Sequence, residues 1–171
     1  MIILVGKGGS GKSSVLRALT DLGFRRITTC TTRPMRKGEV DGRDYYFLDE
    51  KTFRKMEREG RFAETTHTGK YSYGSLKESY EDPKGVIILD PTGVRNVLGA
   101  IGKERATVFF LDAPDALLIK RMTERGDGLE SATVRLKEDN ERFEGFSLYD
   151  FRVDQNETLT VDKIANLISW F

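Results

Sequence analysis

The chain has 171 residues, of which 38% are hydrophobic and 32% are charged, and its formal net charge is +1. A chain of this length can bury the core of one domain, and its balanced charge argues against general affinity for nucleic acid. The composition contains no membrane span, and a strand expected at Ile2 leaves no room for a signal peptide, so we expect a cytoplasmic protein without a membrane partner.

The first expected element is a buried strand over Ile2-Ile3-Leu4-Val5, which leads directly into a glycine-rich loop. Residues 6–13 read Gly6-Lys7-Gly8-Gly9-Ser10-Gly11-Lys12-Ser13, the G-x-x-x-x-G-K-S pattern of a phosphate-binding loop. Its glycines let the backbone form a nest of N–H donors, and the helix that follows adds its positive dipole end. We expect this loop and Ser14 to bind a nucleoside triphosphate, with Lys12 reaching the β- and γ-phosphates and Ser13 ligating Mg²⁺.

Strands and helices then alternate, which predicts an α/β fold with a parallel sheet covered by helices on both faces. The first helix is expected from Lys12 to about Asp21, closed by Gly23. Buried strands are expected at Gly85–Asp90 and Thr107–Asp112, and a last short strand near 150–154. The remaining helices are expected over about 93–101, 114–125, 131–144 and 160–170.

Residues 29–84 interrupt this alternation with a stretch rich in Thr, Arg, Gly and Tyr. It contains strand-like pieces such as 45–47 and one helical piece from about Lys51 to Glu59. An insertion of this size favours a substrate-binding lobe, and a structural appendage is the alternative. The chain is therefore expected to be one domain, with a core over 1–28 and 85–171, the lobe at 29–84 and a short helical lid at about 122–135.

Two single residues complete the inventory of reactive side chains. Cys30 is the one cysteine, which excludes an internal disulfide and fits a reducing compartment; we interpret it as a small, partly buried hydrophobic residue. His67 is the one histidine, too few for a histidine-based metal site, and we interpret it as an incidental surface residue.

The lobe carries three motifs that resemble those of one family. Residues 31–47, Thr31-Thr32-Arg33-Pro34-Met35-Arg36-Lys37-Gly38-Glu39-Val40-Asp41-Gly42-Arg43-Asp44-Tyr45-Tyr46-Phe47, resemble the T-T-R-x-x-R-x-G-E-x-x-G-x-D-Y-x-F signature of guanylate kinases. The segments 60–64 and 69–75 are similar to that family's G-x-F-x-E and G-x-x-Y-G-S. The resemblance covers about residues 1–154. It implies a P-loop nucleoside monophosphate kinase fold and an enzyme that transfers a phosphoryl group from Mg²⁺-ATP to GMP.

Four side chains of the lobe suit the phosphate of a nucleoside monophosphate. Arg33 and Arg36 supply forked donors for a dianionic phosphate, and Tyr45 and Tyr73 can each donate an O–H to it. The resemblance implies that these four residues form the GMP phosphate clamp. The alternative is that the arginines are ordinary solvated side chains.

Glu64 suits guanine for a separate reason. Guanine presents adjacent N1–H and N2–H donors, which a carboxylate accepts as a pair, whereas the edge of adenine does not match. The resemblance gives Glu64 this role and places the hydroxyl groups of Thr29 and Ser75 near the base.

Three arginines are expected over the ATP phosphates. Arg121 and Arg125 share one helix face, and Arg135 follows on the next helix after a short turn. The resemblance implies that Arg121 packs on adenine and that Arg125 and Arg135 close over the phosphates. With Lys12 and Arg33, these last two form the expected catalytic set.

The sequence also departs from the family pattern. Thr65 follows Glu64 where many guanylate kinases have Trp, and the segment Asp90-Pro91-Thr92-Gly93 is a shortened form of D-I-D-x-Q-G. Asp90 either caps the next helix or contacts the base or the water shell of Mg²⁺, and both interpretations stay open. For Asp112 we favour helix capping.

We therefore expect ATP-dependent phosphorylation of GMP and dGMP. One alternative is a kinase for another small phosphate acceptor, such as a modified deoxynucleoside monophosphate or a ribose bisphosphate, although Glu64 argues against the latter, which has no base. Another is a non-catalytic interaction module related to guanylate kinases, against which the intact Lys12-Ser13 pair argues.

Overall fold

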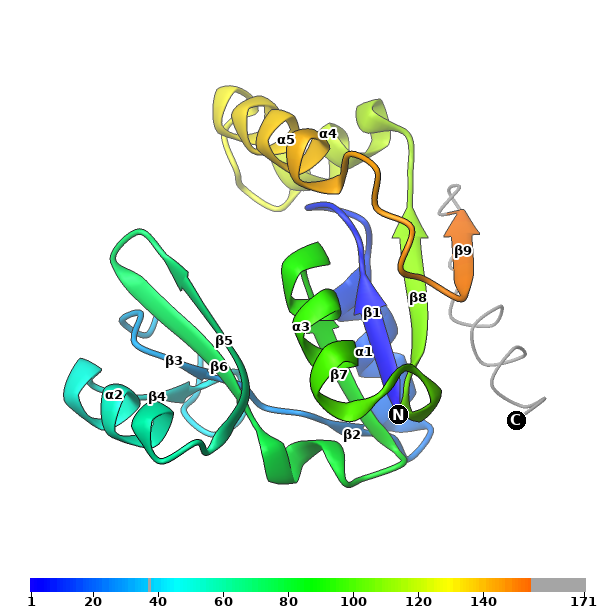
Figure 1. Cartoon of the computed structure of the whole chain (residues 1–171). Coiled ribbons are helices and arrows are strands. Elements are labelled where there is room, and N and C mark those ends of the chain that lie inside the picture. The colour runs from blue at the N-terminus through cyan, green and yellow to red at the C-terminus, as the bar shows by residue number, and fades with distance from the viewer. Residues whose placement is uncertain (37, 155–171) are drawn as a thin grey trace.

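The computed structural model describes residues 1–36 and 38–154, and a five-stranded sheet forms its centre (Figure 1). The strand order is β2-β7-β1-β8-β9, and each neighbouring pair is parallel. The strands are β1 (Ile2–Val5), β2 (Arg25–Arg26), β7 (Gly85–Leu89), β8 (Thr107–Asp112) and β9 (Phe151–Asp154). The parallel α/β architecture expected from the sequence is confirmed, whereas the expected helix over 160–170 lies outside the described residues.

The two faces of this sheet pack against different helices, as expected for a buried parallel sheet. In β1, Ile2 and Leu4 pack toward α1 (Lys12–Asp21), and Ile3 and Val5 pack on the opposite face. That opposite face is covered by α3 (Pro91–Ile101), through residues such as Val94 and Val97. The carboxyl ends of the strands point toward α4 and α5 (Figure 1).

A second, mixed sheet is built from the inserted segment, in the order β4-β3-β6-β5. Its strands are β3 (Cys30–Thr31), β4 (Tyr46–Phe47), β5 (Phe62–Thr68) and β6 (Tyr71–Leu76). The helix α2 (Glu50–Arg58) buries Phe53, which stacks on Phe62 at a ring-centroid distance of 4.6 Å beside the buried Cys30. The lobe therefore has a hydrophobic core of its own, and Cys30 packs in it.

Two helices form a third unit above the carboxyl edge of the central sheet. These are α4 (Asp115–Glu124) and α5 (Leu129–Phe143), which pack through Leu118, Met122, Ala132 and Leu136. Two short 3₁₀ helices, 77–80 and 103–105, complete the connections. In the part of the chain that the structure describes, no helix combines the length and apolar character needed to cross a membrane.

The structure corrects one interpretation of a strand end. The side chain of Asp112 does not cap a helix: α4 begins after Pro114 without a side-chain cap. The Asp112 carboxylate instead accepts the N–H of Ala113 at 3.0 Å and pairs with Arg152 of β9 at 2.6 Å. Because α4 begins at Asp115, three residues after Asp112, this carboxylate instead joins two neighbouring strands.

Candidate active site

The loop between β1 and α1 lies at the carboxyl edge of the central sheet. Gly9 and Gly11 have φ angles of 79° and 87°, which lie in the left-handed region that favours glycine. A Cβ atom on Gly9 would approach the carbonyl oxygen of Leu118 in α4 to 2.8 Å. Glycine is therefore required here both by the curl of the loop and by its close approach to α4.

Lys12 is held by its own loop. Its Nζ donates to the carbonyl oxygens of Gly6 at 2.7 Å and of Lys7 at 2.8 Å. Burial, together with Arg135 and Arg125 nearby, lowers the pKa of Lys12 from 10.5 to about 8, although Asp139 opposes this shift. The ammonium group therefore lies among the backbone groups of the phosphate-binding loop, at the position where it can exchange carbonyl partners for phosphate oxygens.

A buried carboxylate from α5 also contacts this loop. Asp139 is 7% exposed, and its Oδ2 accepts the backbone N–H of Gly8 at 2.6 Å. A Cβ atom on Gly8 would approach the Asp139 carboxylate to 3.2 Å, so the absence of a side chain at Gly8 leaves room for this contact. The hydrogen bond ties α5 to the start of the phosphate-binding loop.

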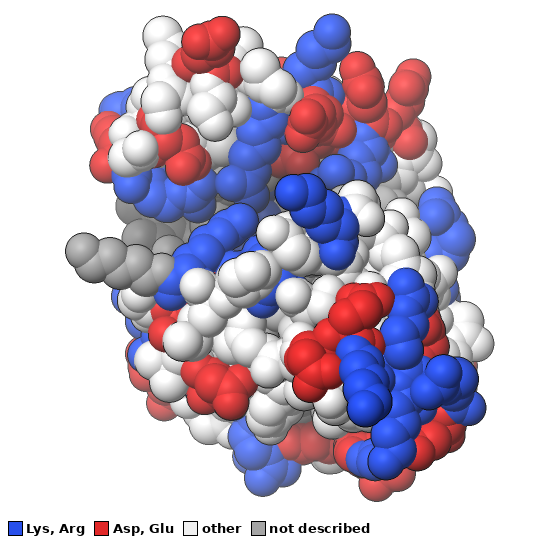
Figure 2. Space-filling model, turned by 90° about the vertical axis from the view of Figure 1, so that its left-hand side faces the viewer, with Lys and Arg blue, Asp and Glu red and all other residues white. Residues whose placement is uncertain are grey.

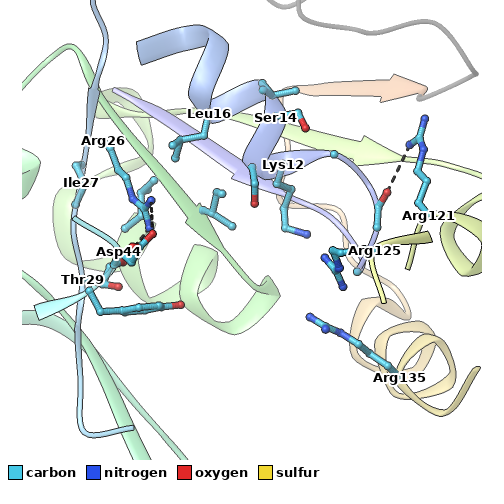
Figure 3. A pocket seen from close by; sticks show the side chains of 18 residues that line it. Lys12, Ser14, Leu16, Arg26, Ile27, Thr29, Asp44, Arg121, Arg125 and Arg135 are labelled. Carbon is cyan, nitrogen blue, oxygen red and sulfur yellow. Dashed lines mark hydrogen bonds and ion pairs between the residues drawn. The ribbon is translucent and has the colours of Figure 1, made fainter. Parts of the chain in front are cut away.

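The loop forms one wall of a cavity of about 670 Å³. Lys12, Arg125 and Arg135 point toward the same space, and Arg121 lies beside the loop with an Nη1–O distance of 3.5 Å to Gly9 (Figure 3). The other lining residues of the loop and the first turn of α1 are Gly8, Gly9, Gly11, Ser13 and Ser14. The structure thus brings the loop and all three predicted lid arginines together.

The opposite wall of this cavity comes from the segment leading into the lobe. Arg26 donates to the backbone oxygen of Asp44 at 2.8 Å, and both residues line the cavity together with Thr29 and Tyr45. On the face of the molecule seen in Figure 2, basic side chains gather across the middle, whereas the top and bottom carry a mixture of acidic and basic side chains. Among the described residues, the lining of the first cavity itself holds one lysine and four arginines against the single carboxylate of Asp44, so its charge suits an anionic ligand.

A second cavity of about 450 Å³ adjoins the first. Thr29, Tyr45 and Ile88 line both cavities, so the two share a boundary. The other residues that line the second cavity are Glu64, Thr66, Tyr73, Gly74, Leu89, Asp90, Thr92, Gly93 and Arg142. Together with Thr29 and Tyr45, the lining includes five of the eight residues that the sequence predicts for GMP.

Glu64 is held in place by a neighbour on the paired strand. Ser75 lies opposite Glu64 in the β5–β6 ladder, and its buried hydroxyl donates to Glu64 Oε1 at 2.7 Å. Burial and, to a lesser degree, the nearby Asp90 raise the pKa of Glu64. Ser75 therefore orients the carboxylate, and it does not itself line the second cavity.

Asp90 performs one of its two predicted roles directly. Its Oδ1 accepts the N–H of Gly93 at 2.7 Å, so it caps α3, and it also lines the second cavity beside Glu64.

Ser13, the predicted Mg²⁺ ligand, lines the first cavity instead. No cluster of three or more His, Cys, Asp or Glu residues that could hold a metal occurs among the described residues. A Mg²⁺ ion bound mainly by nucleotide phosphates fits this donor set, with Ser13 as protein ligand.

The predicted phosphate clamp is assembled only in part. Tyr45 and Tyr73 line the second cavity, with their rings 6.2 Å apart. Arg33 is turned to Glu39, to which its two terminal nitrogens donate at 2.7 and 3.0 Å. Arg36 is exposed and donates its backbone N–H to the same carboxylate at 2.7 Å. Within the described part of the chain, neither arginine lines the two cavities.

The sequence reasoning missed two residues of α5: Arg142, which lines the second cavity, and Asp139, which contacts the phosphate-binding loop. Asp139 and Arg142 follow Arg135 by four and seven residues, so all three share one face of the helix. Because Arg135 belongs to the lid set, this spacing alone was a signal that could have found them.

His67, expected to be incidental, lies at the surface but contacts Glu57 at 3.0 Å and Ser72 at 2.9 Å.

The lowered pKa of Lys12 predicts a pH effect. Below about pH 8 the free enzyme keeps Lys12 charged, and above that value the ammonium loses its proton. We expect kcat/KM for ATP to fall about tenfold per pH unit well above pH 8, because this parameter reports the free enzyme. The value of kcat at saturating ATP should stay level to higher pH, because bound phosphates stabilise the charged form. Steady-state kinetics from pH 6.5 to 10 test this, and a level kcat/KM to pH 10 would contradict it.

Comparison with known proteins assigns the family. A family model described as guanylate kinase matches residues 1–169. The guanylate kinase of Rhodopseudomonas palustris is 32% identical over 161 residues, covering 90% of this chain and 73% of the relative. That of Thermotoga maritima is 31% identical over 180 residues, covering 98% and 85%.

Solved structures agree on the fold. The guanylate kinase from Anaplasma phagocytophilum superposes with a TM-score of 0.76 at 22% identity, covering 99% of this chain and 84% of that one. A shikimate kinase from Acinetobacter baumannii gives a TM-score of 0.57 at 18% identity, covering 99% and 92%. These structures share the architecture, and the match of the family model over nearly the whole sequence decides the assignment: the chain belongs to the guanylate kinase family.

Proposed function

We propose that this protein is an ATP:GMP phosphotransferase that also accepts dGMP. The observation that carries the proposal is the arrangement of the two cavities, which meet at Thr29 and Tyr45. One contains the phosphate-binding loop with Lys12 and four arginines, and the other contains Glu64. An ATP in the first cavity and a GMP in the second would therefore bring their phosphates together at the shared boundary.

In this reaction an oxygen of the GMP phosphate attacks the γ-phosphorus of ATP in line. The bond from the γ-phosphorus to its bridging oxygen breaks, so that GDP and ADP result. Lys12, Arg125 and Arg135 stabilise the negative charge on the transferring phosphoryl group. Ser13 and the triphosphate would hold a Mg²⁺ ion, which would supply further charge neutralisation. Closure of lobe and lid excludes water, which would otherwise accept the phosphoryl group.

The acceptor is held at both ends. Glu64 accepts the N1–H and N2–H of guanine, and Tyr45 and Tyr73 donate to its phosphate. Arg33 and Arg36 complete the clamp when the lobe closes, and Arg33 then exchanges Glu39 for the phosphate. We place the enzyme in the cytoplasm, in keeping with the free, buried Cys30.

A coupled ADP-release assay over all ribo- and deoxynucleoside monophosphates tests this function. We expect turnover with GMP and dGMP far above that with AMP, CMP, UMP and dTMP, because Glu64 matches the donor edge of guanine. Reactions without acceptor provide the control for ATP hydrolysis. Turnover with a pyrimidine nucleotide or a sugar phosphate, and none with a guanine nucleotide, would overturn the substrate assignment.

A further inference from the structure

The second cavity contains a basic side chain from the core side of the molecule. Arg142 lies in the last turn of α5, and among the described residues that line this cavity it is the one Lys or Arg. Glu64 reaches the same cavity from the lobe, and Asp90 reaches it from the start of α3. A ligand held between them would meet carboxylates on one side and a guanidinium group on another.

The helix turn that carries Arg142 is held in place by contacts with its neighbours. Its Nη1 is 3.5 Å from Oδ1 of Asp139, and the other oxygen of Asp139 accepts the N–H of Gly8. The next residue, Phe143, stacks on Phe110 of β8 at a ring-centroid distance of 5.6 Å and an interplanar angle of 16°. The backbone of this turn is therefore anchored to the central sheet, and its guanidinium is oriented by a buried carboxylate.

Donor groups remain available on this guanidinium. The side chain of Arg142 is 46% exposed and meets Asp139 only as an ion pair at 3.5 Å, so most of the five N–H donors of its guanidinium remain available. The remaining donors form the fork with which arginine binds two neighbouring acceptor atoms at once.

Guanine has such a pair of acceptors. When Glu64 takes the N1–H and N2–H donors, O6 and N7 remain on the neighbouring edge of the base, and arginine binds this pair in bidentate geometry. We propose that Arg142 is a second base-recognition residue, which donates to the O6 and N7 atoms of the acceptor guanine, with Asp139 as its positioning residue. This inference rests on the proposed function, because it requires GMP in the second cavity.

A substrate analogue isolates the contact. 7-Deaza-GMP lacks the N7 acceptor but keeps the phosphate, the sugar and the edge facing Glu64. We expect the unmodified enzyme to use it roughly tenfold less well than GMP in kcat/KM, mainly through KM. The variant Arg142→Ala should lose at least tenfold with GMP and should use the two nucleotides about equally.

Two further variants separate contact from structure. Arg142→Lys keeps the charge without the fork and should also lose most of the GMP preference. Asp139→Asn retains an oxygen acceptor for Gly8 but removes the charge facing Arg142, so the preference should shrink while the thermal midpoint changes little. Arg95→Ala, which removes an exposed arginine of α3, is the matched control and should keep both activity and preference.

The outcomes are distinct. If Arg142→Ala lowers kcat/KM equally for GMP and 7-deaza-GMP, or leaves both values as they are, the ratio of the two stays that of the unmodified enzyme. In that case Arg142 does not contact this edge of the base, and the inference is wrong. If Arg142→Ala does not fold, the ratio in Arg142→Lys decides in the same way. If the unmodified enzyme phosphorylates no guanine nucleotide, the proposed function itself fails, and the inference fails with it.

Discussion

Replacement of Lys12 by alanine should lower kcat by roughly a thousandfold or more, because the transferring phosphoryl group loses a charge that stabilises it. The Nζ atom of Lys12 lies within the loop, 2.7 Å from the Gly6 carbonyl oxygen, in the cavity that also contains Arg125 and Arg135. Single-turnover kinetics with saturating ATP measure the loss at the chemical step.

The affinity for GMP provides an internal control for this variant. Calorimetric binding of GMP should change little, because Lys12 does not line the second cavity. Lys120→Ala removes an exposed lysine of the lid helix α4 and should retain near-native turnover. A Lys12→Ala enzyme with near-native kcat would mean that another site performs the transfer.

The second large effect concerns the choice of base. Glu64→Gln keeps the size of the side chain but replaces one acceptor oxygen with a donor amide, which would face the donors of guanine. We expect a loss of about 2–4 kcal/mol in kcat/KM for GMP, on the order of 30- to 1,000-fold. Selectivity for GMP over AMP should narrow as well, because an amide offers the one donor and one acceptor that the edge of adenine requires.

Two other variants define what this result means. Tyr45→Phe removes a phosphate-facing hydroxyl, so its loss should be equal for GMP and AMP and the selectivity should persist. Glu78→Gln changes an exposed carboxylate that pairs with Arg61 outside the cavities. Both kcat/KM for GMP and the selectivity for GMP over AMP should stay unchanged in this variant. An unaltered GMP/AMP ratio in Glu64→Gln would show that Glu64 does not read the base.

The central sheet was predictable because β1, β7 and β8 are buried on both faces and appear as continuous apolar runs. The strand β2 escaped prediction: it consists of Arg25 and Arg26, and only pairing with β7 makes it a strand. The β5–β6 hairpin was missed for a similar reason. Several of its polar side chains, such as Glu64 and Thr66, line the second cavity, and two serines are buried, so the sequence lacks the alternation of a half-buried strand.

Residue types predicted the site better than residue pairings did. The phosphate-binding loop and the lid arginines reach a common cavity because regular elements position them: the loop comes directly after β1, and the arginines lie on α4, at its end, or on α5. Arg33 differs, since its partner Glu39 belongs to the same motif and an isolated motif does not reveal whether its charges face a ligand or each other. Asp139 likewise meets Gly8 across 131 positions of sequence, a distance over which local pattern carries no information.

The cationic side chains of the site already have acceptors within the protein, so a nucleotide phosphate must replace these acceptors when it binds. Lys12 donates to carbonyl oxygens of its loop, Arg33 donates to Glu39, and Arg125 donates to Asp127 at 2.6 Å. Around the first cavity, the partners of Lys12 and Arg125 offset part of the repulsion between these two positive charges. An arriving phosphate therefore displaces ligands already in place, and the heat released is the difference between two sets of strong contacts. The affinity for nucleotide therefore depends on the contacts that are given up as well as on the contacts that are formed.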